Sequence, residues 1–129
     1  MLRKGMIGTI ESQVKESMTA ESVGSGELKV YATPMLIALA EETAWKSVAG
    51  ELEPGQGTVG TKINIEHIAA TPVGMKVRCE TELIDIDRRR LTFSVNVCDE
   101  TGKIAEGIHE RFIVDSEKFQ EKANAKARD

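Results

Sequence analysis

The stretch ATPMLIALAEETAWKSV, residues 32–48, predicts the helix around which this chain folds. Thr33 is a favoured helix N-cap, and Pro34 is tolerated at the first helical position because its missing N–H would have no partner there. Apolar side chains recur at helical spacing, and the glycines and proline of the following GELEPGQG end the run. Ile37 and Trp45 add apolar groups on a second side, which predicts a helix buried around much of its circumference.

One carboxylate, Glu41, lies on the side of this helix that otherwise looks apolar. Helical spacings of three and four residues place it in line with Ile37, Trp45 and Val48. An exposed ion pair with a lysine four residues later explains the neighbouring Glu42, but Glu41 has no such partner. A carboxylate among apolar groups costs several kcal/mol unless it is paired or neutralised. Glu41 therefore either reaches solvent at the rim of the core or belongs to a site, and the pattern leaves both readings open.

Composition bounds the class of protein. A chain of 129 residues with 40% hydrophobic and 29% charged residues predicts a single globular domain, residues 1–129. The net charge of −4 gives no support to nucleic-acid binding. Cys79 and Cys98 form no C-x-x-C pair, so no metal site or redox motif is expected. Without a signal-peptide core or an apolar run of about 20 residues, we expect a cytoplasmic protein with no membrane association.

Four later segments alternate apolar and polar residues with the period of a β-strand: 58–68, 75–83, 91–97 and 104–114. In the first, one phase is expected to face the helix: Val59, Thr61, Ile63, Ile65 and His67. Short, turn-rich connectors predict an antiparallel meander with the helix packed on one face, an α+β fold.

The two ends of the chain are harder to interpret. In residues 1–31, GTIESQV (8–14) is compatible with a strand, and residues 20–31 look like a mobile loop followed by a short extended piece. Residues 116–129 are expected to form a charged terminal helix or a frayed tail.

Three residues join Glu41 as candidates for chemistry. His67 lies in the helix-facing phase of its strand, where a core imidazole bonded to a backbone carbonyl is the structural alternative to proton transfer; His109 is a weaker example of the same kind. Thr33 is explained by helix capping, although its hydroxyl near a helix N-terminus also suits the orientation of water or a carbonyl. Gly60 interrupts a strand and lets a ligand approach its backbone amide. Together these groups suit the hydrolysis of an activated acyl group.

The segments ATPMLIALAEETAW, LEPGQGTVGTKINIEHIAATPVGMKV and GIHERFIVDSEKF resemble the fluoroacetyl-CoA thioesterase-like family of the hotdog superfamily. The similarity covers roughly residues 30–125. It implies a curved antiparallel sheet wrapped around a long central helix. It also implies a homodimer with acyl-CoA sites near the subunit interface and no cofactor other than the CoA of the substrate. The family's catalytic threonine, glutamate and histidine fall on Thr33, Glu41 and His67, and its glycine and an arginine of its site fall on Gly60 and Arg111.

One departure from the family concerns the acyl group. The fluoroacetyl-specific enzyme carries phenylalanines before the helix, whereas SVGSGELKVYAT (22–33) contains none. The resemblance implies a thioesterase, and this departure predicts a small or medium acyl-CoA rather than fluoroacetyl-CoA as its substrate. In the mechanism that we expect, Thr33 orients Glu41. Two alternatives stay open: a hotdog hydratase or dehydratase, although no Asp-x-x-x-x-His segment is present, and a protein that binds acyl-CoA or a small apolar ligand without turnover. Lys62, Arg78 and Arg88 to Arg90 are candidate contacts for the CoA phosphates, with a solvated turn as the alternative for the arginine cluster.

Overall fold

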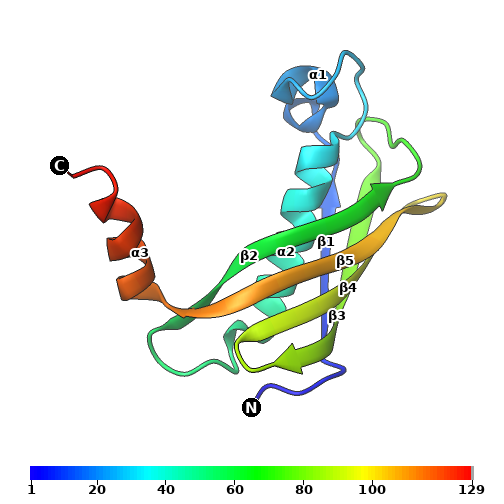
Figure 1. Ribbon diagram of the computed structural model, residues 1–129. Helices are drawn as coiled ribbons and strands as arrows, with labels where there is room; N and C mark the ends of the chain where they lie inside the picture. The colour runs from blue at the N-terminus through cyan, green and yellow to red at the C-terminus, as the bar shows by residue number, and fades with distance from the viewer. Residues whose placement is uncertain (129) are drawn as a thin grey trace.

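The computed structural model describes residues 1–128, and its main feature is one antiparallel sheet of five strands. These are β1 (Ile7–Gln13), β2 (Gln56–His67), β3 (Lys76–Asp87), β4 (Arg90–Asp99) and β5 (Gly102–Asp115). Their order in the sheet is β1-β3-β4-β5-β2, so β1 and β2 form its two edges (Figure 1). The predicted meander of four strands is present, and the N-terminal stretch that looked compatible with a strand is the fifth.

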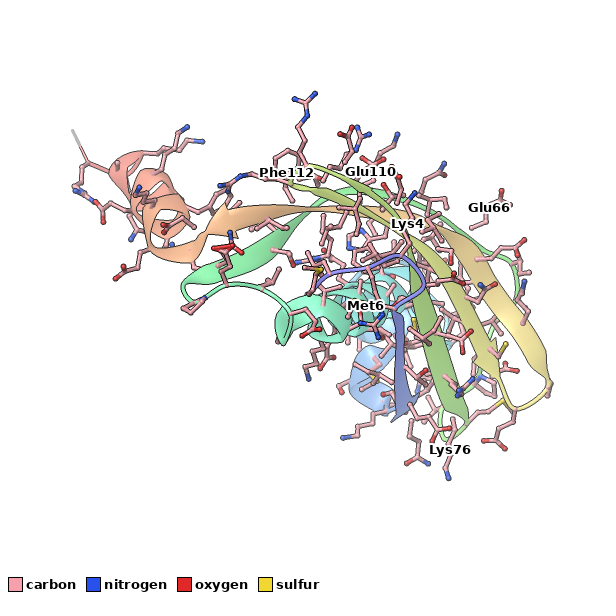
Figure 2. The ribbon with its side chains drawn as sticks, turned by 90° about the horizontal axis from the view of Figure 1, so that it is seen from below. Lys4, Met6, Glu66, Lys76, Glu110 and Phe112 are labelled. Carbon is pink, nitrogen blue, oxygen red and sulfur yellow. The ribbon has the colours of Figure 1, made fainter. Side chains whose placement is uncertain are left out.

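The long helix α2 (Thr33–Ala49) packs against the inner face of this sheet, which curves over it in the view of Figure 2. Side chains of β3 and β4 point alternately toward the helix and toward solvent, as their sequence pattern predicted. The core residues that they contribute include Val77, Cys79, Leu83, Leu91, Phe93, Val95 and Val97, and α2 adds Leu36, Leu39, Ala40, Ala44 and Val48. The α+β architecture and the curved sheet around a central helix are thus confirmed.

The helix is not buried around its circumference as expected. Trp45 is 42% exposed, and Ala38 is also exposed, whereas Ile37 and Glu41 are half-buried. One chain supplies only one sheet, and this sheet covers one side of α2. The stripe through Ala38, Glu41 and Trp45 is left uncovered within a single chain.

The expected phase of β2 is correct only for its second half. The pairing with β5 shifts register between Gly60 and Lys62, which leaves Thr61 as the extra residue of a β-bulge. Val59 pairs with Phe112 on the outer face of the sheet, so the prediction that Val59 faces the helix is wrong. Because a bulge inverts the alternation, Gly60 faces inward together with the later residues Ile63 and His67.

Short elements close one end of the helix. A single turn of 3-10 helix, η1 (Glu16–Met18), precedes α1 (Ala20–Val23). The segment predicted to be a mobile loop contains α1, and two backbone hydrogen bonds link this helix to residues 28–30: Ala20 N to Val30 O at 2.9 Å and Glu21 N to Leu28 O at 3.0 Å. The expected extended piece corresponds to isolated β-bridges at Val30 and Tyr31.

The C-terminal segment is a helix, α3 (Ser116–Ala125), which stands away from the sheet in Figure 1. The side chain of Asp115 caps it by accepting a hydrogen bond from Lys118 N. Among residues 1–128, no helix is both long and apolar enough to cross a membrane.

Candidate active site

Thr33 and His67 form the first half of the candidate site. The Thr33 hydroxyl lies 2.8 Å from His67 Nδ1, a hydrogen bond between the start of α2 and the end of β2. The prediction that Thr33 is the N-cap is wrong, because Ala32 holds that position and Thr33 is already helical, with no capping bond from a side chain. The hydroxyl of Thr33 is therefore available to the imidazole.

The environment of His67 favours its neutral form. Desolvation lowers the pKa of His67 below its ordinary value, and the nearby backbone of Ala69 only partly opposes this. Its Nε2 is buried and has no hydrogen-bond partner among the described residues. A hollow of about 300 Å³ opens beside Thr33 and His67, with Tyr31 and Ile68 in its wall. A neutral imidazole with one free nitrogen can accept or relay a proton there.

Glu41 and Gly60 form the second half. A Cβ atom added at Gly60 would lie only 2.5 Å from Glu41 Oε2, so the carboxylate rests directly against the glycine backbone. Arg111 Nη1 lies 3.6 Å from the same oxygen. The carboxylate side chain is 40% exposed, which answers the question raised by its place on the helix: Glu41 is paired on one side and open on the other.

A buried polar network holds Arg111. Its Nε donates to Thr58 Oγ1 at 2.8 Å, and its Nη2 donates to the Thr58 carbonyl at 3.0 Å. His109 Nε2 lies 3.1 Å from Nη1, and His109 Nδ1 lies 2.8 Å from the carbonyl of Lys62. Burial lowers the pKa of the Arg111 guanidinium, while Glu41 acts in the opposite direction. His109 and Arg111 were candidates in the sequence, whereas Thr58 carried no signal and faces inward because of the bulge.

The two halves do not converge within one chain. Thr33 and Glu41 are eight residues apart on α2, about 12 Å along the helix axis. Gly60 and His67 are seven residues apart on β2, about 23 Å when extended. The hydroxyl of Thr33 bonds to His67, so the expectation that Thr33 orients Glu41 is wrong for these two residues of the same chain.

The basic residues considered for the CoA phosphates lie in different places. Arg88 and Arg89 form the β3–β4 turn, and Arg90 begins β4. Asp87 pairs with Arg88 at 3.8 Å and with Arg90 at 3.1 Å. These pairs fit the alternative of a solvated turn. Lys62 contributes its carbonyl to His109, and its side chain is exposed.

The curved sheet wrapped around one helix is a hotdog fold. The hydroxyl–imidazole pair and the carboxylate against the glycine backbone are groups that thioester hydrolysis can use. The sequence model of the fluoroacetyl-CoA-specific thioesterase (FlK) family matches residues 14–117. The chain belongs to this family.

Known relatives agree with this assignment. The fluoroacetyl-CoA thioesterase of Streptantibioticus cattleyicolor is 39% identical over 98 residues, which cover 76% of this chain and 70% of that protein. A solved structure of the fluoroacetyl-CoA thioesterase FlK superposes with a TM-score of 0.92 at 32% identity, covering 98% of each chain. A thioesterase superfamily member from Thermus thermophilus superposes with a TM-score of 0.88 at 25% identity, covering 96% of this chain and 92% of the other.

Proposed function

We propose that this enzyme hydrolyses the thioester of a small or medium acyl-CoA to the free acid and CoA, without being specific for fluoroacetyl-CoA. The contact that carries the proposal is that of the Glu41 carboxylate with the backbone of Gly60, because it joins a reactive group to a candidate oxyanion donor. A structure of a FlK variant in complex with fluoroacetate and CoA, 33% identical with a TM-score of 0.87 over 92% of this chain and 99% of the other, supports CoA as the thiol half of the substrate.

Each site residue has a role in this proposal. The Gly60 amide stabilises the developing oxyanion, and Glu41 either attacks the carbonyl carbon to form an anhydride or removes a proton from the attacking water. Neutral His67 handles protons and is oriented by the Thr33 hydroxyl at 2.8 Å. Arg111 holds Glu41 in place. The reaction itself calls for no cofactor or metal ion, because the thioester is already activated, and the cytoplasm remains the expected compartment.

The walls of the hollow beside His67 support a broader acyl group than fluoroacetyl. Apart from Tyr31 and the pair Thr33 and His67, its side chains are small or aliphatic: Ala20, Ser25, Val30, Ile68, Ala69 and Ala70. No phenylalanine from the segment before α2 closes it, and its volume of about 300 Å³ is more than two carbons require.

A homodimer would bring the two halves of the site together. β2 is an edge strand, so its outer side has no neighbouring strand among the described residues and can pair with a strand of a second subunit. A two-fold axis near Asn64 would pair Ile63 with the partner's Ile65. It would also bring the partner's His67 opposite the bulge at Gly60 and Thr61. The same arrangement would cover the exposed stripe of α2 that includes Trp45, which is 42% exposed in one chain.

The acyl specificity is tested by measuring CoA release from a panel of acyl-CoAs, from acetyl and fluoroacetyl to long-chain and aryl. We expect hydrolysis of several small or medium substrates at comparable kcat/KM, and its collapse in His67→Ala. A strong preference for fluoroacetyl-CoA would refute the proposed breadth. Tight binding without any CoA release would instead indicate a binding protein.

The composite site is tested by mixing two inactive variants, Glu41→Gln and His67→Ala. If each site takes Glu41 from one subunit and His67 from the other, every mixed dimer has one intact site. Random exchange should then restore about a quarter of wild-type activity. Mixtures that stay inactive although mass spectrometry detects mixed dimers would show that each chain supplies its own complete site.

A further inference from the structure

His109 is fully buried and makes two hydrogen bonds that together fix its protonation. Its Nδ1 lies 2.8 Å from the Lys62 carbonyl, which can only accept, so Nδ1 carries a proton. Its Nε2 lies 3.1 Å from Arg111 Nη1, which can only donate, so Nε2 must be the unprotonated nitrogen. Only the neutral Nδ1–H tautomer satisfies both contacts.

The bond from Arg111 to His109 involves the guanidinium nitrogen that faces Glu41. The other two guanidinium nitrogens are both held by Thr58. Nη1 carries two protons: one is taken by His109, which leaves the other for Glu41 Oε2, 3.6 Å away. Without His109, the two bonds to Thr58 would still hold one edge of the guanidinium, but Nη1, the nitrogen that faces Glu41, would lose its fixed acceptor.

We propose that His109, held as the neutral Nδ1–H tautomer by the Lys62 carbonyl, is a positioning residue that sets the orientation of Arg111 toward Glu41. The inference rests on the proposed function of Glu41. It adds to the residues at the reacting atoms a buried imidazole that does not touch the substrate. His109 touches neither the hollow beside His67 nor the open side of Glu41. Its Cε1 lies beside the backbone of Gly60, and its hydrogen bond to the site is the one with Arg111.

The surroundings of His109 keep it neutral. Desolvation lowers its pKa below the ordinary value, and the charge of Arg111 acts in the same direction. The bond to the Lys62 carbonyl and the carboxylates of Glu41 and Glu110 oppose this without reversing it. On its other side the imidazole stacks on Phe93, with ring centroids 6.2 Å apart and planes at 29°. The ring is therefore fixed in orientation as well as in charge.

Two substitutions separate the two bonds of the imidazole. Glutamine places an amide near the Nε2 position, where it can accept from Arg111, whereas asparagine reaches only the Nδ1 position and keeps the donor to Lys62. We expect His109→Asn to lower kcat by about tenfold or more with KM changed little, and His109→Gln to retain kcat within about threefold. Equal losses in the two variants would overturn the proposal.

A double-mutant cycle tests whether the effect passes through Arg111. In an Arg111→Lys background, His109→Asn should lower kcat by less than about twofold, because the guanidinium that His109 positions is gone. A loss as large as in the wild-type background would assign His109 a general structural role. Val77→Ala is the matched control, since Val77 is a buried core residue without a bond to the network, and it should lower stability while leaving kcat of the folded enzyme unchanged.

Nitrogen-15 NMR of the histidine rings tests the arrangement independently of activity. We expect His109 in the wild type to show a protonated Nδ1 and an unprotonated Nε2 at neutral pH. We also expect restricted rotation about the Cζ–Nη1 bond of Arg111 that is lost in His109→Asn and kept in His109→Gln. The opposite tautomer, or a freely rotating guanidinium in the wild type, would refute the positioning. Failure of the wild type to hydrolyse any acyl-CoA would instead refute the proposed function and leave the NMR result intact.

Discussion

The substitution Gly60→Ala should separate catalysis from stability in this enzyme. Its Cβ would lie 2.5 Å from Glu41 Oε2, and 3.3 Å from both Arg111 Nη1 and His109 Cε1. An ordinary carbon–oxygen contact is about 3.5 Å, so the carboxylate must move by about 1 Å. A displacement of this size at a reacting group costs on the order of a hundredfold in rate. We therefore expect kcat to fall by about that factor.

The stability of Gly60→Ala should change little. The Glu41 carboxylate, which must move farthest, ends a flexible side chain that is 40% exposed and can rotate toward solvent. The buried side chains of Arg111 and His109 must each give by only a few tenths of an ångström. We expect a loss of about 1 kcal/mol in the free energy of unfolding. Acyl-CoA hydrolysis and chemical denaturation measure the two quantities on the same sample. A kcat within about twofold of wild type would refute the reasoning, because Glu41 would then not need its place against Gly60.

A matched control exists at Gly8, where β1 passes close to α2. A Cβ there would lie 2.6 Å from Ser47 Cβ and 2.8 Å from the carbonyl oxygen of Thr43, which are fixed by the helix. We expect Gly8→Ala to lower the free energy of unfolding by about 1–3 kcal/mol and to leave kcat of the folded fraction unchanged. The two alanine substitutions should thus have opposite profiles.

Two further predictions concern Thr33 and His67. Thr33→Val should lower kcat by about tenfold or more while changing stability by less than about 0.5 kcal/mol, since Ala32 rather than Thr33 is the N-cap; a loss near 1 kcal/mol in thermal or chemical unfolding would restore the capping role. Because folding lowers the pKa of His67, the unfolded chain binds the extra proton more readily, and stability should fall as pH drops below about 6.5. Urea denaturation across this range should show that the free energy of unfolding depends less steeply on pH in His67→Gln than in the wild type. Identical slopes would contradict the lowered pKa of His67.

The sequence by itself determined α2 and the four strands that follow it, but not α1 or η1 near the N-terminus. Periodicity was sufficient because the faces of β3 and β4 and the length of α2 follow from local spacing. The resemblance of the three quoted segments then implied the family and the candidate residues Thr33, Glu41, His67, Gly60 and Arg111.

Only the tertiary structure decided how these residues are grouped. The bulge at Thr61 turns Gly60 inward. The alternation of apolar and polar residues cannot predict this bulge, because the extra residue is defined only by the pairing of β2 with β5. The bonds of Arg111 to Thr58 and His109 join positions far apart in sequence. The exposure of Trp45 likewise depends on how much of α2 one sheet can cover. Local spacing fixes which face a side chain occupies within an element, but the partner that it meets depends on how the elements pack.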